Sequence, residues 1–186
     1  MARYDFVVLG SGPAGRRAAV QAAKLGKSVL VIDNRARVGG VSVHTGTIPS
    51  KTLRETVLNL SGWRERGFYG QSYRVKRDIA PADLAQRLGK TLDHEISVLE
   101  HQFARNGVKV VRGKGRFLGP HRIAIAHEEG EDVVEMDKAL IATGTVPFHP
   151  PGIPFNGTSV LDSDMFIRNP CVPRSLTVVG AGVIGL

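Results

Sequence analysis

The chain has 186 residues, of which 42% are hydrophobic and 23% are charged, a balance that excludes wholesale disorder and allows one full domain and the start of a second. The formal net charge of +8 leaves nucleic-acid binding open, but the basic residues are scattered, so a solvated surface that attracts anionic nucleotides explains the charge better. No apolar run approaches the roughly 20 residues of a membrane span, and no secretory signal is visible, so we expect a cytoplasmic protein without membrane contact.

The first forty residues predict a β-α-β unit. Residues 4–9 are largely apolar and predict a buried parallel strand. A glycine-rich turn follows at 10–15, and Pro13 suits the first turn of a helix that runs to about Leu25. Gly26 is the expected cap of this helix, and residues 28–32 predict a second, parallel strand.

The rest of the chain predicts two more helices and then short strands. Residues 35–49 predict a loop, 50–66 a helix, 67–78 an irregular segment, and 81–105 a long helix whose apolar stripe is expected to pack in the core. Residues 146–154 contain four prolines and predict a linker. The predicted strands cover residues 108–112, 115–118, 122–126, 133–142 and, after the linker, 175–179.

The turn at residues 10–15 has the spacing of a phosphate-binding loop. Three glycines, Gly10, Gly12 and Gly15, serve in such loops for the tight turn, the close approach of a diphosphate, and helix–strand packing. Pro13 and Ala14 open the helix, whose amino terminus offers free N–H groups to phosphate. Asp33 lies 18 residues after Gly15, near the spacing expected for a ribose-binding carboxylate, and Asn34 and Arg35 adjoin it. The alternatives are an ordinary glycine turn and a surface carboxylate.

The segment 39–51 is a glycine-rich loop that enters a helix, with Ser50 as the expected cap. Here the chain resembles the two-dinucleotide-binding flavoprotein reductases, such as dihydrolipoamide dehydrogenase and glutathione reductase. Those enzymes carry a Cys-x4-Cys redox pair in this loop, and the matching positions are Ser42 and Thr47. Neither side chain has the sulfur that thiol–disulfide exchange requires, which argues against a dithiol reductase. The resemblance implies that FAD lies against Gly39, Gly40, Val41, Ser42, Gly46 and Thr47.

The run from Gly46 to Arg54 is similar to one branch of that family, the soluble pyridine nucleotide transhydrogenases, which have threonine at the second position. Ser42 departs from the cysteine that many of them keep at the first. The branch implies reversible hydride exchange between NADPH and NAD⁺ through bound FAD. Two rivals stay open: an NAD(P)H–quinone or dye reductase that uses the same flavin, and a truncated flavin-binding module without turnover.

Lys51 is the catalytic candidate. The matching lysine of the family lies beside the flavin, where a cation stabilises negative charge on the reduced ring. The alternative is a solvated lysine in a first helical turn, which is an electrostatically poor place for one.

Three later segments match the family as well. Ala142, Thr143 and Gly144 end a predicted strand and correspond to a segment that touches FAD. Gly115, in a Gly-x-Gly-x-Phe segment, corresponds to the adenine side, and Ser163 to a segment close to the flavin; for Gly115 a β-turn is a serious alternative. A second strand-and-glycine motif corresponds to the start of an NAD(P)-binding domain, with Gly180, Gly182 and Gly185.

The resemblance therefore implies an α/β protein: a Rossmann-like FAD-binding domain with a β-meander insertion at residues 1–150, then a linker and the truncated start of a second Rossmann-like domain at 151–186. Full-length relatives imply nicotinamide dinucleotide substrates and a homo-oligomer, and we expect the 186 residues alone to lack transhydrogenase activity and to bind FAD poorly. No histidine falls in a metal-binding spacing, and Cys171, the only cysteine, excludes an internal disulfide.

Overall fold

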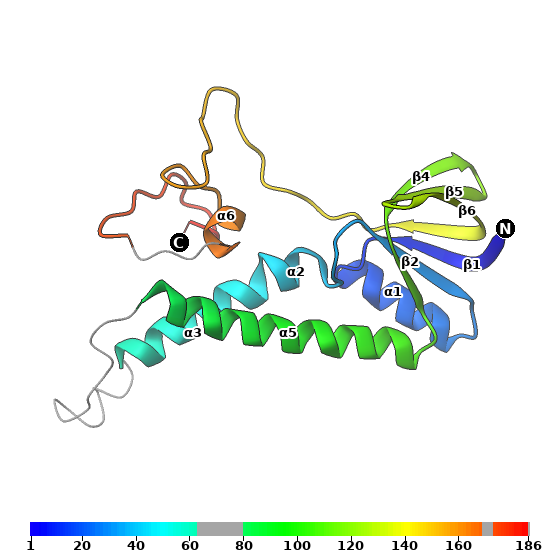
Figure 1. Cartoon of the computed structure of the whole chain (residues 1–186), viewed down its shortest axis with the longest axis horizontal. Coiled ribbons are helices and arrows are strands. Elements are labelled where there is room, and N and C mark those ends of the chain that lie inside the picture. The colour runs from blue at the N-terminus through cyan, green and yellow to red at the C-terminus, as the bar shows by residue number, and fades with distance from the viewer. Residues whose placement is uncertain (63–79, 169–172, 186) are drawn as a thin grey trace. The chain divides into compact units, whose positions relative to one another are not determined.

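The computed structural model describes residues 1–62, 80–168 and 173–185 (Figure 1). The chain divides into two compact units, one made of Met1–His44 and Asp93–Thr145, the other of Thr45–Leu92 and Val146–Leu186. A long helix, α5 (Pro81–Arg105), contributes to both. The domain boundary near residue 150 stays a prediction.

The first compact unit begins with the predicted β-α-β motif. Strand β1 (Ala2–Leu9), helix α1 (Pro13–Lys24) and strand β2 (Val29–Asp33) follow one another, and β1 pairs with β2 in parallel. Gly26 closes α1 with a φ of 76°, a left-handed conformation that glycine adopts without strain. The two predicted strands and the predicted cap are confirmed, with β1 beginning two residues earlier and β2 shifted by one.

Four more strands complete one six-stranded sheet in the order β3-β2-β1-β6-β5-β4. Strand β3 pairs with β2, and β6 with β1, in parallel, whereas β4, β5 and β6 pair antiparallel as a meander. The strands are β3 (Lys109–Arg112), β4 (Lys114–Gly119), β5 (Arg122–His127) and β6 (Gly130–Ile141). The predicted Rossmann-like α/β fold with a meander is confirmed.

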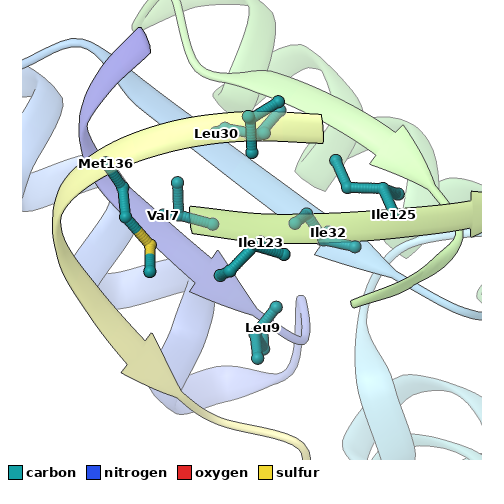
Figure 2. Close-up of a cluster of buried hydrophobic side chains, with 8 residues drawn as sticks. Val7, Leu9, Leu30, Ile32, Ile123, Ile125 and Met136 are labelled. Carbon is teal, nitrogen blue, oxygen red and sulfur yellow. The ribbon is translucent and has the colours of Figure 1, made fainter. Parts of the chain in front are cut away.

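The core of the first unit lies between the parallel strands and the meander. Side chains at alternate positions of β1 and β2 meet those of β5 and β6, because alternate residues of a strand point to the same face. Figure 2 shows Ile123 and Ile125 of the meander over Val7, Leu9 and Ile32. The opposite face of β1 meets α1, since Val8 lies next to Gly15. This packing holds the carboxyl ends of β1 and β2 in place.

Helix α5 has the predicted bounds, and its apolar stripe packs in the core, as predicted. Pro81 occupies the first turn, and the N–H of Ala80 donates to the carboxylate of Asp83 at 3.0 Å, which is the reciprocal half of a capping box. In the first unit Ile96, Leu99 and Phe103 are buried. In the second unit Leu84 and Leu88 pack with two further apolar residues, Leu53 and Ile167.

Two predictions between residues 35 and 66 need correction. The predicted loop contains a short helix, α2 (Gly40–His44), and α3 (Thr47–Ser61) begins three residues before the expected start at Ser50. Pro49 fits in the first turn because its missing N–H has no helical acceptor there. Gly62 ends α3 with a φ of 62°. The predicted continuation to residue 66, the segment 67–78 and Cys171 lie outside the described residues.

In the carboxyl-terminal segment, residues 163–168 form a short helix, α6 (Ser163–Arg168), which the sequence did not predict. Residues 146–154 form neither helix nor strand, in agreement with the predicted linker. The predicted strand at 175–179 is wrong: these residues join no ladder among the described strands. An apolar run becomes a strand only where a neighbour accepts and donates its backbone hydrogen bonds.

Candidate dinucleotide-binding site

The loop between β1 and α1 is held by the protein's own backbone at two of its three glycines. Gly10 has a φ of 104°, and its N–H donates to the carbonyl of Ile32 at 2.7 Å. A Cβ on Gly10 would overlap the carbonyl oxygen of Ala142, and one on Gly15 would overlap that of Gly10. Both positions therefore require glycine whether or not a ligand binds.

Gly12 differs from these two glycines. Its φ of −64° suits any residue, and an added Cβ would meet only the Cα of Gly40, at an ordinary contact distance of 3.8 Å. Neither backbone conformation nor packing within the described residues requires glycine here. A ligand that approaches the backbone would require it, and the diphosphate of a dinucleotide does so at this position of the motif.

The amino terminus of α1 supplies the charge that such a diphosphate needs. The first N–H groups of a helix have no partner within it, and they lie at the positive end of its dipole. The first turn contains no acidic residue, and Pro13 and Ala14 are exposed. Arg16 follows in the same helix, where burial, helped by Arg17, lowers the pKa of its guanidinium. The residues present thus fit a dinucleotide diphosphate.

Asp33 ends β2 beside this loop and is only 8% exposed. Its Oδ2 accepts from the N–H of Ser11 at 2.7 Å and from the Ser11 hydroxyl. Its Oδ1 accepts from the N–H of Arg35 at 2.9 Å. A carboxylate offers about four acceptor positions, so one stays open for a ribose hydroxyl.

A second glycine turn packs directly against the first. Gly39 and Gly40 have φ values of 122° and 62°, and a Cβ on Gly40 would lie 2.6 Å from the Cα of Gly12. Helix α2 follows with Val41 and Ser42, and the Ser42 hydroxyl donates to the carbonyl of Gly39 at 3.2 Å. The predicted residues of the two turns are therefore brought together.

The segment after β6 returns to the loop between β1 and α1. The N–H of Ala142 donates to the carbonyl of Leu9 at 2.8 Å, which sets Ala142 and Thr143 against Gly10. Gly144 has a φ of 70°, so the chain turns there in a conformation that favours glycine.

Two cavities lie at the carboxyl ends of β2 and β3. One, of about 350 Å³, is lined by Asp33 and Arg35, and the other, of about 640 Å³, by Asn34, Gly113 and Lys114. Gly115 lines neither: a Cβ there would lie 2.6 Å from Cδ2 of Leu9, so this side chain would have to shift to admit one. Its cofactor contact stays a prediction. Gly113, the first glycine of the same Gly-x-Gly-x-Phe segment, lines the larger cavity, and Lys114 is a lining residue that the sequence did not single out.

The remaining candidates belong to the second unit. Lys51 is exposed on α3, which Gly46 precedes and Thr47 begins. Ser50 is not the cap: its hydroxyl donates to the carbonyl of Thr47 at 3.2 Å from inside the helix. Thr45, which the sequence did not suggest, is 5% exposed, and its hydroxyl has no hydrogen-bond partner among the described residues.

Ser163 begins α6, next to a capping aspartate. Asp162 Oδ1 accepts from the N–H of Met165 at 2.7 Å, and Oδ2 lies 2.6 Å from Nε2 of His149. Burial opposes ionisation of Asp162, but these two partners outweigh it and hold the pKa of the carboxyl below its usual value.

The second glycine motif repeats the local geometry of the first. Gly180 has a φ of 121°, and a Cβ on Gly185 would overlap the carbonyl oxygen of Gly180, as one on Gly15 would overlap that of Gly10. The turn geometry of the first glycine loop therefore recurs here without a strand before it.

Residues 1–62, 80–168 and 173–185, which the structure describes, lack two features. No helix in that part of the chain is long and apolar enough to cross a membrane. The same residues hold no group of three or more histidine, cysteine or acidic side chains suited to a metal ion.

Comparison with known proteins gives consistent matches over the whole chain. The family described as "Pyridine nucleotide-disulphide oxidoreductase" matches residues 4–186. A soluble pyridine nucleotide transhydrogenase of Mycobacterium tuberculosis is 48% identical over 188 residues, which cover 100% of this chain and 40% of the relative. One from Photorhabdus laumondii is 34% identical over 98% of this chain and 39% of its own length. The chain thus spans about 40% of the length of these relatives.

Among solved structures, the Cu(II) complex of the HOCl-induced flavoprotein disulfide reductase RclA from Escherichia coli is similar. It is 27% identical, with a TM-score of 0.81, over 100% of this chain and 38% of that one.

Proposed function

Because the chain belongs to the pyridine nucleotide-disulphide oxidoreductase family, we propose that it binds FAD and is the amino-terminal part of an enzyme that transfers hydride between NADPH and NAD⁺. The observation that carries the binding proposal is Gly12, a glycine that the described protein does not itself require. The activity rests on relatives named soluble pyridine nucleotide transhydrogenase, at 34 to 48% identity.

Four groups of residues would hold the cofactor. The amino terminus of α1 would bind the diphosphate, the open acceptor position of Asp33 a ribose hydroxyl, and the cavities beside Asn34 and Arg35 the adenine. Gly46, Thr47, Ser163 and Lys51 would lie on the flavin side. When bound, FAD supplies a ring that accepts a hydride from a reduced nicotinamide and returns it to an oxidised one.

The chain's own contribution is to orient and to stabilise charge. Lys51 would offer a cation to the negative charge on the reduced ring. Ser42 and Thr47 stand where dithiol reductases of the family have cysteines, and hydroxyl groups cannot exchange with disulfides. Hydride transfer directly between nicotinamide and flavin fits these two residues, whereas a disulfide relay does not.

The second glycine motif supports the proposed nicotinamide-binding part of the enzyme, because Gly180 and Gly185 repeat the turn geometry of the first motif. We propose that it opens an NAD(P)-binding domain, that the full-length enzyme is a cytoplasmic homo-oligomer, and that residues 1–186 alone do not turn over and bind FAD poorly. The share of the relatives that the chain covers supports this last point.

The test is a steady-state assay of the protein extended to the length of its relatives, with NADPH as donor and either NAD⁺ or a quinone as acceptor. We expect faster transfer to NAD⁺, and no loss of activity after treatment with a thiol-alkylating reagent. Turnover with quinone alone would contradict the transhydrogenase proposal and favour a quinone reductase. Hydride transfer by residues 1–186 alone would contradict the proposed inactivity of this segment.

A further inference from the structure

We propose that Ser11 is a positioning residue, whose hydroxyl joins Asp33 to Gly39 and holds the two glycine turns in register before any dinucleotide binds. The inference goes beyond the proposed function, and only its ligand-binding consequence rests on that function.

The Ser11 side chain is fully buried and uses both its donor and its acceptor capacity. Its Oγ donates to Oδ2 of Asp33 and accepts from the N–H of Gly39 at 3.0 Å. The Ser11 N–H donates to the same Oδ2 at 2.7 Å. One hydroxyl thus connects the loop after β1, the end of β2 and the start of the second turn.

This connection lies next to the closest approach of the two turns. Gly12 and Gly40, whose backbones are in contact, directly follow the hydrogen-bonded residues Ser11 and Gly39. Without the hydroxyl, the buried N–H of Gly39 would lose its acceptor, and Asp33 would lose one of its three donors. A buried donor without an acceptor is costly, so the second turn would shift toward water or loosen. The loop would then lose its preformed shape, which raises the cost of binding.

The chain contains a matched control at the other end of the β1–β2 ladder. Ser28 donates to Oδ2 of Asp5 through both its N–H and its hydroxyl, each at 2.7 Å. The N–H of Asp5 donates back to the Ser28 hydroxyl at 2.9 Å. This pair has the same chemistry as Ser11 and Asp33, but it is exposed and far along the strands from the glycine turns.

The first experiment follows hydrogen exchange in the protein without FAD, by mass spectrometry on peptides that contain Gly39. We expect Ser11→Ala to speed exchange in these peptides about tenfold, the equivalent of one hydrogen bond, and to leave peptides from β1 and β6 unchanged. Ser28→Ala should leave the Gly39 peptides unchanged. Equal exchange in Ser11→Ala and the wild type would overturn the inference, as would a uniform rise over all core peptides.

A second variant covers the case in which Ser11→Ala does not fold. Ser11→Cys nearly keeps the side-chain size but hydrogen-bonds weakly, so we expect an intermediate rise in exchange near Gly39. Unchanged exchange in this variant would likewise overturn the inference.

The second experiment measures FAD affinity and kcat in the protein extended to the length of its relatives. Ser11→Ala should weaken FAD binding about tenfold and leave kcat at saturating FAD within about twofold, because a positioning residue does not touch the reacting atoms. A kcat loss with unchanged affinity would overturn the inference. Absence of FAD binding in the wild type would contradict the proposed function instead, and the exchange experiment would still decide the role of Ser11.

Discussion

A serine and an aspartate join β1 to β2 at each end of their parallel ladder, and the two pairs differ in what surrounds them. At the amino end of the ladder, Asp5 and Ser28 are hydrogen-bonded to each other and exposed to solvent. At the carboxyl ends Ser11 and Asp33 are buried and also bind Arg35 and Gly39. Ligands of parallel sheets bind beyond the carboxyl ends of the strands. The exposed pair therefore only joins two strands, whereas the buried pair also shapes the candidate site.

The first prediction concerns the glycines of the buried end and has the largest expected effect on folding. Gly15→Ala should lower the free energy of unfolding by about 3 kcal/mol or more, because the Cβ would overlap the carbonyl oxygen of Gly10. The control is Gly89→Ala in α5, whose added Cβ would meet nothing within 4 Å. That change should stabilise by about 0.5–1 kcal/mol. Denaturant unfolding measures both, and equal stability of the two variants would contradict the packing argument.

The second prediction compares the two carboxylates directly. Asp33→Ala leaves two buried donors and one part-buried donor without their acceptor and should cost about 3 kcal/mol of unfolding free energy. Asp5→Ala should cost less, because water replaces the carboxylate at the exposed end. Denaturant midpoints in the two variants test this order, and an equal or larger loss for Asp5→Ala would reverse the comparison.

The third prediction concerns acid pH and the exposed pair. The hydroxyl and N–H of Ser28 hold the pKa of Asp5 below its usual value. The pair therefore stabilises the fold above the unfolded-state pKa of about 3.9, and this contribution is lost as the pH falls below that value. Unfolding midpoints between about pH 6 and pH 2.5 should fall less steeply in Asp5→Asn than in the wild type. Parallel curves for the two proteins would show that the pair adds nothing.

The sequence predicted the sheet and α5 well because their patterns are long. The stripe from Leu84 to Phe103 repeats over about five helical turns. Strands β1 and β2 each contain an unbroken apolar run, at residues 6–9 and 29–32. Helix α2, with five residues, is too short to show a period. The run at 175–179 has the composition of a strand, but a strand also needs a partner, which composition does not reveal.

The sequence predicted the glycines of the candidate site but not the hydrogen bonds that connect its two turns. The spacing of Gly10, Gly12 and Gly15 is local, so the sequence shows it. Ser11 acts through residues 22 and 28 positions away, which only the fold brings together. A serine between two motif glycines was the available signal, but nothing in the pattern marks its hydroxyl as buried. At Gly115 an added Cβ would lie 2.6 Å from Cδ2 of Leu9, a tertiary contact that the sequence pattern likewise does not show.

The most direct test of the account is Gly12→Ala, the change with the smallest expected effect on folding. An alanine there fits both the backbone and the packing, so the unfolding free energy should change by less than about 1 kcal/mol. FAD titration of the protein extended to the length of its relatives should nevertheless show at least about a tenfold loss of affinity, because the Cβ would occupy the approach of the diphosphate. A stable variant that binds FAD as tightly as the wild type would contradict the assignment of this loop as the cofactor site.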